Sequence, residues 1–451
     1  MSADAETDER LAVFQRRRAR WLAYCNGAIW AVGNGLTSTT LVIYLAMEFD
    51  VPGFGLGISL ILAAPRLAGL LRLVAPALIG RLTDRKRFCL VTYLLSCLVL
   101  FGLPFAAAPG CLPSPLASLA ALVVLWCLYH LLEYLGTVAL WSWLADLVPL
   151  RIRGRFLGRR ERWMVTGQAV AMLAAGLFSY AWSRTHPDSM RWIGYAIPAG
   201  IGAWFMIGSL VPLAMIPGVA AGRAVRHGAT LRAMAAPFRD PRFLRLLLFG
   251  CWFSFSNGVT QLTQSIYPWR ALGIGLFFML GLKTGMRLGQ LSISPWMGRL
   301  ADRLGNRPVM LASLPVVAAG PLFYFLSSPQ QPHWLAATCL AGAWAVWIAY
   351  AGLNVCLPNL MLKLSPQQSN TPYIATYFAV TGLCLAVSTL VGGTLFDWLG
   401  DQTFVLAGGI LRLDYYHYNF LFGWITRTMG LLLLLLVIED QRCPAGHRTA
   451  A

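Results

Sequence analysis

Residues 80–88 read GRLTDRKRF and residues 298–307 read GRLADRLGNR, so a short basic motif that begins with glycine occurs twice in one chain. Long apolar stretches flank each copy, and each copy follows the second apolar stretch of its half of the chain. A motif that recurs at corresponding places indicates an internal duplication, and large membrane proteins are often built from such repeats. We therefore predict two halves that share one plan.

The composition is that of a membrane protein. Of the 451 residues, 57% are hydrophobic and only 12% are charged, and the mean hydropathy is +0.62. A soluble domain carries roughly 25% charged residues, so water is the wrong solvent for most of this chain. Apolar runs of roughly 20 residues, which is the length that crosses a bilayer as a helix, recur along the whole sequence. We predict a multi-pass protein that is embedded in the lipid bilayer.

Twelve membrane-spanning helices account for these apolar runs. Helices satisfy their backbone hydrogen bonds internally, as the bilayer core requires, and the runs are too long for the strands of a membrane barrel. The predicted spans are 21–47, 56–79, 88–107, 116–145, 163–183, 193–217, 244–267, 273–296, 308–327, 334–361, 372–396 and 417–438. The predicted organisation is an N-terminal tail (1–20), a six-helix bundle (21–217), a linker (218–243), a second six-helix bundle (244–438) and a C-terminal tail (439–451).

The basic residues lie in short clusters between the spans, which is the pattern of cytoplasmic loops. With the N-terminus inside, the clusters fall on one side, so we predict that both termini are cytoplasmic and that the membrane is the plasma membrane (bacterial inner membrane). A net charge of +18 does not indicate a nucleic-acid partner, because that function needs basic residues gathered on one soluble face. The N-terminal tail lacks the apolar core of a signal peptide, so we expect the first span to be retained.

No catalytic or metal-binding pattern is present in the sequence. The ten cysteines form no CxxC pair and no cluster with histidine, so we predict neither a metal site nor a disulfide framework. Paired carboxylates, a nucleophile with a neighbouring base and a phosphate-binding loop are also missing. We therefore expect no enzymatic activity and no cofactor.

The duplicated motif resembles the signature of the major facilitator superfamily, which lies between helices 2 and 3 and recurs in degenerate form between helices 8 and 9. The matching residues are Gly80, Leu82, Asp84 and Arg85 in the first copy and Gly298, Leu300, Asp302, Arg303, Gly305 and Arg307 in the second. The pattern that closes helix 4 in many members matches at Asp146, Pro149, Arg153 and Gly154. The resemblance implies an all-α membrane fold with twelve transmembrane helices in two pseudo-symmetric six-helix bundles.

The resemblance also implies a cytoplasmic gate at these motifs. The glycines allow helix ends to approach closely, and the aspartates pair with basic side chains and helix ends to latch the outward-facing state. The alternative is that the basic side chains anchor the loops to anionic lipid. The predicted gate residues are Gly80, Asp84, Arg85, Asp146, Arg153, Gly298, Asp302 and Arg303.

Four charged residues lie at membrane depth, where each costs roughly 2.5–3.5 kcal/mol on insertion scales and therefore indicates a functional site. They are Arg66, Glu133, Lys283 and Arg287, on helices that the family places along its central cavity. If they share that cavity, positive charge is in excess, which favours an anionic or polyhydroxylated solute. Glu133 is the candidate for a coupling proton. The alternative is that Glu133 neutralises Arg66 or Lys283 as a structural pair.

Polar and aromatic residues recur at helical spacing along four spans. They are Asn26, Trp30, Asn34 and Thr37; Trp126, His130, Glu133 and Thr137; Asn257, Gln261 and Gln264; and Trp347 and Asn354. Such stripes are typical of a water-filled path, and we predict that they line the cavity. The alternative is that they hold neighbouring helices together by hydrogen bonds. Arg427, in the last span, has no predicted role.

The sequence therefore favours a secondary active transporter that moves a small organic solute by alternating access, coupled to an ion and active as a monomer. One alternative is a non-transporting membrane assembly factor or sensor. A drug/proton antiporter is a second alternative. Two departures from the family disfavour it: helix 4 lacks a central arginine, and helix 5 lacks the glycine–proline run of drug antiporters.

Overall fold

The computed structural model describes residues 3–49, 51–73, 84–147, 150–218, 231–365, 371–400, 402–406 and 411–437. The first half holds α1 (Ala3–Leu36), α2 (Thr39–Ala46), α3 (Phe54–Ala68), the 3₁₀ helix η1 (Gly69–Leu73), α5 (Arg85–Ala107), α6 (Pro115–Leu147), α7 (Leu150–Thr185), the 3₁₀ helix η2 (Asp188–Met190), α8 (Arg191–Gly208) and α9 (Leu210–Ala214). The second half holds α10 (Leu231–Arg239), α11 (Pro241–Arg270), α12 (Leu276–Leu304), α13 (Asn306–Ala318), α14 (Gly320–Leu326), α15 (His333–Val346), the 3₁₀ helix η3 (Trp347–Ala349), α16 (Tyr350–Leu364), α17 (Thr371–Leu399), β1 (Thr403–Leu406), β2 (Leu411–Asp414) and α18 (Tyr415–Leu436).

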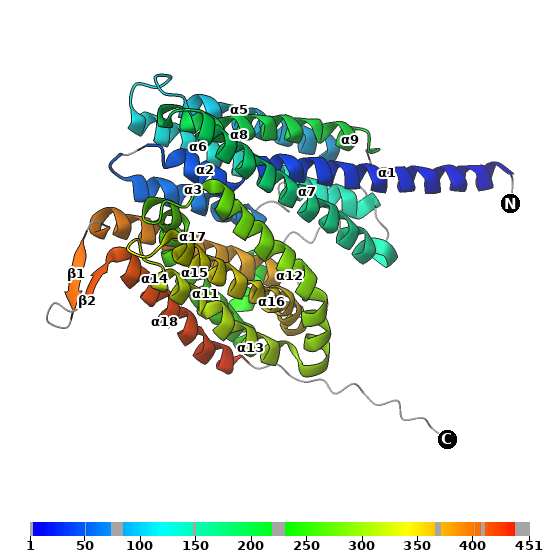
Figure 1. The fold of residues 1–451 in the computed structure, drawn as a ribbon. Coiled ribbons are helices and arrows are strands. Elements are labelled where there is room, and N and C mark those ends of the chain that lie inside the picture. Colours follow the sequence, from blue (N-terminus) through cyan, green and yellow to red (C-terminus); the bar gives the residue numbers. More distant parts are fainter. Residues whose placement is uncertain are drawn as a thin grey trace.

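The helices form two bundles, one from each half of the chain (Figure 1). In the first bundle α1 packs against α7 and α8, and α5 packs against α6 and α8. The corresponding helices of the second bundle repeat these contacts, because α11 packs against α17 and α18, and α13 packs against α16 and α18. The duplication that the repeated motif predicts is thus present in the packing. The bundles meet through α3 with α17 and through α7 with α12.

Ten helical segments of the described chain are long and apolar enough to cross a membrane, and they coincide with ten of the twelve predicted spans. The other two predicted spans, 244–267 and 273–296, fall on α11 and α12. These helices are 30 and 29 residues long, but polar and charged side chains interrupt their apolar surface. The all-α, twelve-helix membrane architecture is therefore confirmed, and the two predicted spans without a long uninterrupted apolar stretch belong to the second bundle.

Among the interrupted spans are the first, the ninth and the tenth, each of which is divided near its middle. Between α1 and α2, Thr37 Oγ1 donates to Gly33 O at 2.8 Å and Ser38 caps the new helix by accepting from Leu41 N. The break between α13 and α14 lies at Ala319, just before Pro321. The 3₁₀ helix η3 joins α15 to α16. Interrupted helices at membrane depth are tolerated where they line a site buried within the protein, and they often mark it.

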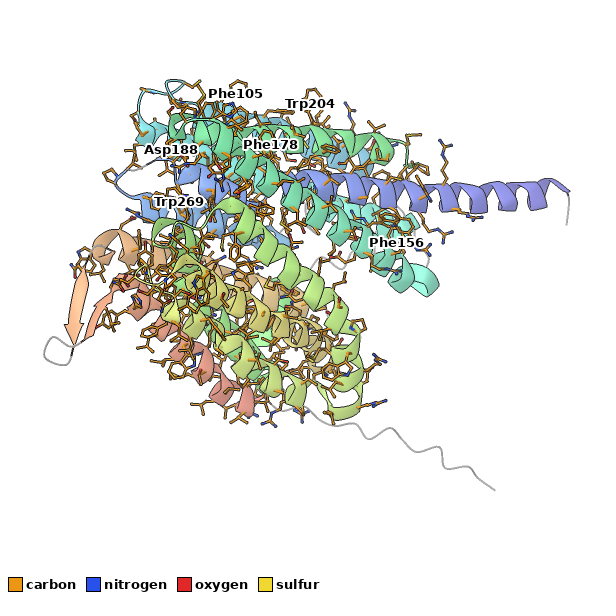
Figure 2. The ribbon with its side chains drawn as sticks, viewed as in Figure 1. Phe105, Phe156, Phe178, Asp188, Trp204 and Trp269 are labelled. Carbon is orange, nitrogen blue, oxygen red and sulfur yellow. The ribbon has the colours of Figure 1, made fainter. Side chains whose placement is uncertain are left out.

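The outer surface of the bundles is apolar. Phe105, Phe178 and Trp204 lie on the outside of the first bundle (Figure 2), with 68%, 36% and 66% of their surfaces exposed. Large exposed apolar surfaces are rare on soluble monomers, whereas lipid covers them without cost. This surface fits the bilayer environment that the composition predicts.

An antiparallel pair of short strands, β1 and β2, connects α17 to α18 in a segment that the sequence leaves as a loop, with Thr403 opposite Asp414. We call the end of the molecule with this pair, together with residues 47–49, 51–53, 108–114, 186–190 and 271–275, the hairpin end. The opposite end, with residues 17–20, 84–87, 215–218 and 304–306, is the tail end. Figure 1 shows the hairpin end on the left and the beginning of α1, at the tail end, on the right.

Candidate functional site

A cavity of about 590 Å³ lies between the two bundles. Residues from α2, α3, η1 and α6 of the first bundle and from α11, α12, α14, η3 and α15 to α18 of the second line it. The first, ninth and tenth spans, which are divided near their middle, reach its wall through Thr40, Tyr324 and Trp347. The predicted site residues that line it are Arg66, Asn257, Gln261, Gln264, Lys283, Arg287, Trp347 and Asn354.

The predicted site residues of α1 and α6 lie outside this lining and bond mainly within the first bundle. They are Asn26, Trp30, Asn34, Thr37, Trp126, His130, Glu133 and Thr137. Asn26 Nδ2 donates to Ser209 O at 2.9 Å, and Trp126 Nε1 donates to Ile61 O at 3.1 Å. These bonds join α1 to the segment after α8 and join α6 to α3. For Asn26 and Trp126, these interhelical bonds are of the kind that the sequence left as an alternative.

The polar stripe of α6 faces its own bundle. Thr137 Oγ1 donates to Glu133 Oε1 at 2.8 Å and lies 2.8 Å from the hydroxyl of Tyr93 on α5, and His130 packs edge-on against Trp126. Within the described residues Glu133 forms no ion pair with Arg66 or Lys283. Tyr134, the next residue after Glu133, lines the cavity in its place. Because successive helical residues are about 100° apart, the rotation of α6 about its axis decides which of the two faces the cavity.

Two cations of α12 reach across the cavity to the first bundle. Lys283 Nζ donates to Thr40 Oγ1 on α2 at 2.9 Å, and Arg287 Nη1 donates to Gln168 Oε1 on α7 at 2.6 Å. Gln168 Nε2 in turn donates to Asn34 Oδ1 on α1 at 2.6 Å. Both cations therefore join the bundles through neutral partners, and Asn34 is connected to the cavity through Gln168.

Arg427 on α18 also lines the cavity, although the sequence assigned it no role. Its Nη2 donates to Thr260 Oγ1 on α11 at 3.0 Å, and its guanidinium lies 6.0 Å from the ring centre of Trp347. The sequence does show an arginine inside an apolar span. It was given no role because the family that the sequence resembles places helix 12 at the periphery of the bundle. Tyr324 and Tyr350 were missed for another reason, since aromatic residues are common in apolar helices.

The charge of the cavity wall is one-sided. Its described lining contains four cations, namely Arg66, Lys283, Arg287 and Arg427, and neither aspartate nor glutamate. Amide side chains and aromatic rings make up much of the remaining wall. Arg427 is buried and Lys283 is half-buried, whereas Arg66 and Arg287 are exposed. A buried cation needs an acceptor or a counter-charge, and the four charges have the same sign, so such a wall favours an anion with a polar or ring-shaped body. Elsewhere, among the residues that the structure describes, no three His, Cys, Asp or Glu side chains gather as metal ligands.

At the hairpin end the second bundle caps a helix of the first. Helix α3 begins after Gly53, which has a left-handed backbone (φ 77°) and no side chain with which to cap the helix. The carboxylate of Asp397 on α17 takes that role, accepting from Gly55 N at 2.6 Å and from Leu56 N at 2.8 Å. A carboxylate at a helix N-terminus satisfies free N–H groups and interacts favourably with the helix dipole. This contact holds the bundles together at one end.

Close packing and aromatic contacts support that capping bond. A side chain at Gly55 would place its Cβ 2.7 Å from Gly393 O, so α3 and α17 touch backbone to backbone. The guanidinium of Arg270 lies 5.3 Å from the ring of Phe54 and 5.7 Å from that of Phe396, which belong to different bundles. The hairpin end is therefore closed around contacts between the bundles.

A second group at the hairpin end surrounds Arg191. Its Nε lies 3.1 Å from Glu48 Oε1, and its guanidinium lies 5.7 Å from the ring of Trp269 in the second bundle, where Figure 2 shows that residue. Burial raises the pKa of the Glu48 carboxyl above its ordinary value, and the Arg191 charge offsets part of that shift. Tyr44 adds a further link between the bundles, because its hydroxyl donates to Ile274 O at 2.9 Å.

The predicted gate residues belong to the tail end. Asp84 caps α5 by accepting from Arg87 N at 2.9 Å, whereas Asp302 and Arg303 are exposed at the end of α12. Within the described chain Asp302 forms no ion pair. A Cβ at Gly298 would make an ordinary van der Waals contact, 3.9 Å from a methyl group of Val355, so no close helix approach occurs at this glycine in the described structure. Gly80 and the side chains of Asp146 and Arg153 lie outside the described residues, and Arg85 is engaged in an interaction of its own.

Comparison with known proteins agrees with this architecture. The Major Facilitator Superfamily profile matches residues 23–369. No curated protein matches the chain. Similar solved structures include a mutant of the nucleoside transporter NupG (12% identity, 94% of this chain and 100% of that chain, TM-score 0.69) and a D-xylose–proton symporter (14%, 94% and 97%, 0.66). An inward-open structure of the xylose transporter XylE from E. coli is also similar (14%, 93% and 99%, 0.61).

At these identities the structural similarity establishes the fold alone, whereas the profile match covers most of the chain. The profile match, the two six-helix bundles and the central cavity agree with one another. The chain belongs to the major facilitator superfamily and is a membrane transporter, not an enzyme.

Proposed function

We propose that this protein is a secondary active transporter that carries a small organic anion, or a polyhydroxylated solute with an anionic group, across the plasma membrane. The observation that carries the proposal is the cavity between the bundles, whose described wall holds four cations and no carboxylate. A solute that brings a negative charge to this wall balances the excess of positive charge and supplies a partner for the buried guanidinium of Arg427. The nucleoside and xylose transporters with similar folds support a polyhydroxylated body for the solute.

The cationic wall also bears on the two alternative functions. A drug/proton antiporter for cationic drugs would meet like charges in this cavity, which is unfavourable. A non-transporting assembly factor or sensor would have no need for a polar cavity at the junction of its bundles, where apolar side chains pack more favourably. Secondary transport by a single chain is therefore the function that the geometry supports best.

Alternating access follows from the unequal ends of the molecule. The contacts of Asp397 with α3 and of Lys283 with Thr40 hold the bundles together at the hairpin end and near the cavity. We infer that rocking of the bundles breaks these contacts and closes the tail end. In that second state the gate residues named above form the latch, with the glycines at 80 and 298 permitting the close approach.

Glu133 is our candidate for the coupling proton. Within the described residues, acidic side chains other than Glu133 lie at or near the ends of the membrane spans, so this carboxyl is the one placed to exchange a proton at membrane depth. Its bond from Thr137 and the adjacent Tyr93 connect it to neighbouring hydroxyls, and its neighbour Tyr134 faces the cavity. Hydroxyls in such a chain can both donate and accept, which suits proton transfer.

The orientation of the protein is open to a direct test. Cys111 lies at the hairpin end and is the exposed cysteine among those described. We expect a membrane-impermeant maleimide to label Cys111 in intact cells, and labelling to disappear in Cys111→Ser. Labelling of cysteines placed within residues 80–87 from the same side would overturn the proposal that the tail end and both termini are cytoplasmic.

The proposed solute class is tested by binding and transport in proteoliposomes. A panel of organic acids, sugars and sugar phosphates is screened for ligands that raise the melting temperature of the purified protein, as any ligand of the folded state does. Uptake of each hit is then measured for wild type, Arg66→Ala and Lys283→Ala. We expect anionic hits to lose roughly tenfold or more in affinity in at least one variant, because hydrogen bonds to charged groups contribute about 1.5–3 kcal/mol. Unchanged affinity in both variants would refute an anion site in this cavity.

A further inference from the structure

Arg427 differs from the other cations of the cavity in that two of its nitrogen atoms are fully buried and have no hydrogen-bond acceptor within the described residues. Its side chain is 1% exposed, and Nη2 is bonded to Thr260. Nε and Nη1 have no acceptor within the described residues, and both atoms are closed off from water. A guanidinium has no acceptor of its own and stays charged, so these N–H groups need a partner from elsewhere.

No carboxylate of the described second bundle neutralises this charge. Asp240 caps α11, Asp397 caps α3 and Asp414 caps α18, all at helix ends, while Asp302 is exposed. A buried cation without a counter-charge destabilises the ligand-free fold. Such an arrangement is expected where the missing counter-charge is supplied by a ligand.

Gln264 on α11 indicates where that ligand binds. Its Oε1 lies 3.5 Å from Arg427 Nη2, which is the long limit of a hydrogen bond. The amide orientation is set by Arg427, because the reverse orientation would bring two donors together. Nε2 of Gln264 consequently faces away from Arg427, and it too has no acceptor in the described structure. Two neighbouring side chains thus offer donors for which the described part of the chain provides no acceptor.

The wall beside these donors is aromatic. Tyr324 stacks on Trp347 with ring centres 5.7 Å apart and planes 28° apart, and Trp344 meets Trp347 edge-on at 5.4 Å. All three residues line the cavity. Flat aromatic surfaces favour planar rings and the apolar faces of sugar rings. A cavity of about 590 Å³ has room for a solute of one or two rings.

The hydrogen bonds of the two α12 cations cross from one bundle to the other, unlike those of Arg427. Lys283 and Arg287 each donate to a neutral partner in the first bundle, and these bonds depend on how the bundles stand relative to one another. The partners of Arg427 belong to its own bundle, so they remain in place when the bundles rock. Arg427 can therefore hold the same group of a solute in every state of the cycle.

We propose that the cavity binds a ring-bearing carboxylate, with the carboxylate at Arg427 and Gln264 and the ring against Trp347, Tyr324 and Trp344. On binding, the carboxylate replaces the weakly held Gln264 Oε1 beside the guanidinium, and the Gln264 amide N–H turns to the same anion. The inference rests on the proposed transport function and assigns within it the residue that recognises the charge.

One test needs no ligand. Arg427→Met keeps the length of the side chain and removes the charge, and we expect the ligand-free protein in detergent to melt at a higher temperature than wild type. Relief of an uncompensated buried charge has this effect. Arg191→Met, which removes a partly exposed cation that is paired with Glu48, serves as the control and is expected to lower the melting temperature. A fall in Arg427→Met as large as that in the control would show that Arg427 is a structural anchor, and would overturn the inference.

The second test is isothermal titration of the full-length protein with matched pairs of probes. Benzoate against benzyl alcohol and glucuronate against glucose distinguish an aromatic ring from a sugar ring. We expect an acid of one pair to bind, its neutral counterpart to bind at least tenfold more weakly, and Arg427→Met to remove that difference. Arg427→Lys is expected to restore part of it, and Gln264→Leu to weaken the acid a few-fold while leaving the neutral probe unchanged.

The outcomes separate this inference from the proposed function. Acid binding that is lost in Lys283→Ala but unchanged in Arg427→Met would overturn the role of Arg427 and leave anion transport standing. Neutral probes that bind as well as the acids would overturn the carboxylate and leave a transporter of polyhydroxylated solutes. Absence of binding by both acids would overturn the ring-bearing carboxylate, and the broader solute panel would then decide the proposed function.

Discussion

The two bundles share one helix plan but direct their polar side chains differently. In the first bundle Asn26 and Trp126 bond to backbone carbonyls of neighbouring helices in the same bundle. In the second bundle Lys283, Arg287 and Asp397 all reach across to the first bundle, where their partners are hydroxyl, amide and backbone groups. In these three contacts the second bundle supplies the charge and the first bundle supplies a neutral partner, although the first bundle also contributes Arg66 to the cavity wall.

A polar stripe on a membrane helix thus has two uses with similar sequence patterns. A stripe that faces its own bundle contributes interhelical hydrogen bonds, which are worth roughly 0.6–2 kcal/mol each in membranes. A stripe that faces the junction leaves its groups available for a solute or for the other bundle. Substitutions in the two bundles test this division, and the change with the greatest expected consequence is that of Glu133.

Glu133→Gln removes a charge that lies at membrane depth in the first bundle. The side chain of Glu133 faces its own bundle and not the cavity. If Glu133 carries the coupling proton, the variant is expected to lose concentrative uptake entirely while solute exchange without a gradient continues, because binding and rocking remain intact. Uptake and counterflow in proteoliposomes measure the two properties separately. Thr137→Val, which removes the bonded hydroxyl but leaves the carboxyl, is the control and is expected to retain accumulation. Undiminished accumulation by Glu133→Gln would place the coupling elsewhere.

Gly55→Ala tests the close contact between the bundles. The added methyl lies 2.7 Å from backbone oxygen, so the hairpin end cannot close as it does here. Overpacking of this kind costs about 1–3 kcal/mol, which corresponds to roughly a 5- to 150-fold loss of the closed state and a comparable fall in transport rate. Gly281→Ala, on a helix position with open space around it, is the matched control. Equal rates in the two variants would show that this contact does not limit the cycle.

Asn257→Leu and Asn26→Leu compare the same substitution in the two bundles. Asn257 lines the cavity and accepts from the Tyr350 hydroxyl at 2.8 Å, so we expect its loss to weaken solute binding by about tenfold, as a lost polar contact does. Asn26 bonds only within its bundle, and its loss is expected to lower the melting temperature with affinity unchanged. Isothermal titration measures the solute affinity of both variants, and thermal melting measures their stability. The comparison fails if Asn26→Leu weakens solute binding as strongly as Asn257→Leu does.

Asp397→Ala and Asp240→Ala compare a cap that crosses the junction with a cap inside one bundle. Each carboxylate accepts from two backbone N–H groups at a helix start. Removal of a helix cap costs about 1 kcal/mol, or roughly fivefold in a population. We expect Asp397→Ala to raise maleimide labelling of a cysteine introduced beside the cavity from the hairpin end. Asp240→Ala should lower the melting temperature without changing the labelling. Equal labelling in both variants would contradict the role of Asp397 in holding the hairpin end closed.

Much of the architecture could be predicted from the sequence. The twelve apolar spans, the duplicated motif and the family follow from composition and spacing, because the bilayer requires long apolar helices whatever their neighbours are. The breaks within spans and the strand pair at 403–414 could not be predicted in the same way, since they depend on local hydrogen bonds such as that of Thr37 to Gly33. Eight of the sixteen predicted site residues line the cavity in the structure.

Residue spacing alone places polar residues on one face of α1, α6, α11 and α12, because helical periodicity needs no knowledge of neighbours. Which way each face points depends on the packed bundles. Helix rotation is set by packing against neighbours, and a turn of about 100° exchanges Glu133 for Tyr134 at the cavity wall. The same holds for Arg427, whose position beside Trp347 depends on how α18 packs against α11. The sequence of a single helix does not determine how that helix packs against its neighbours.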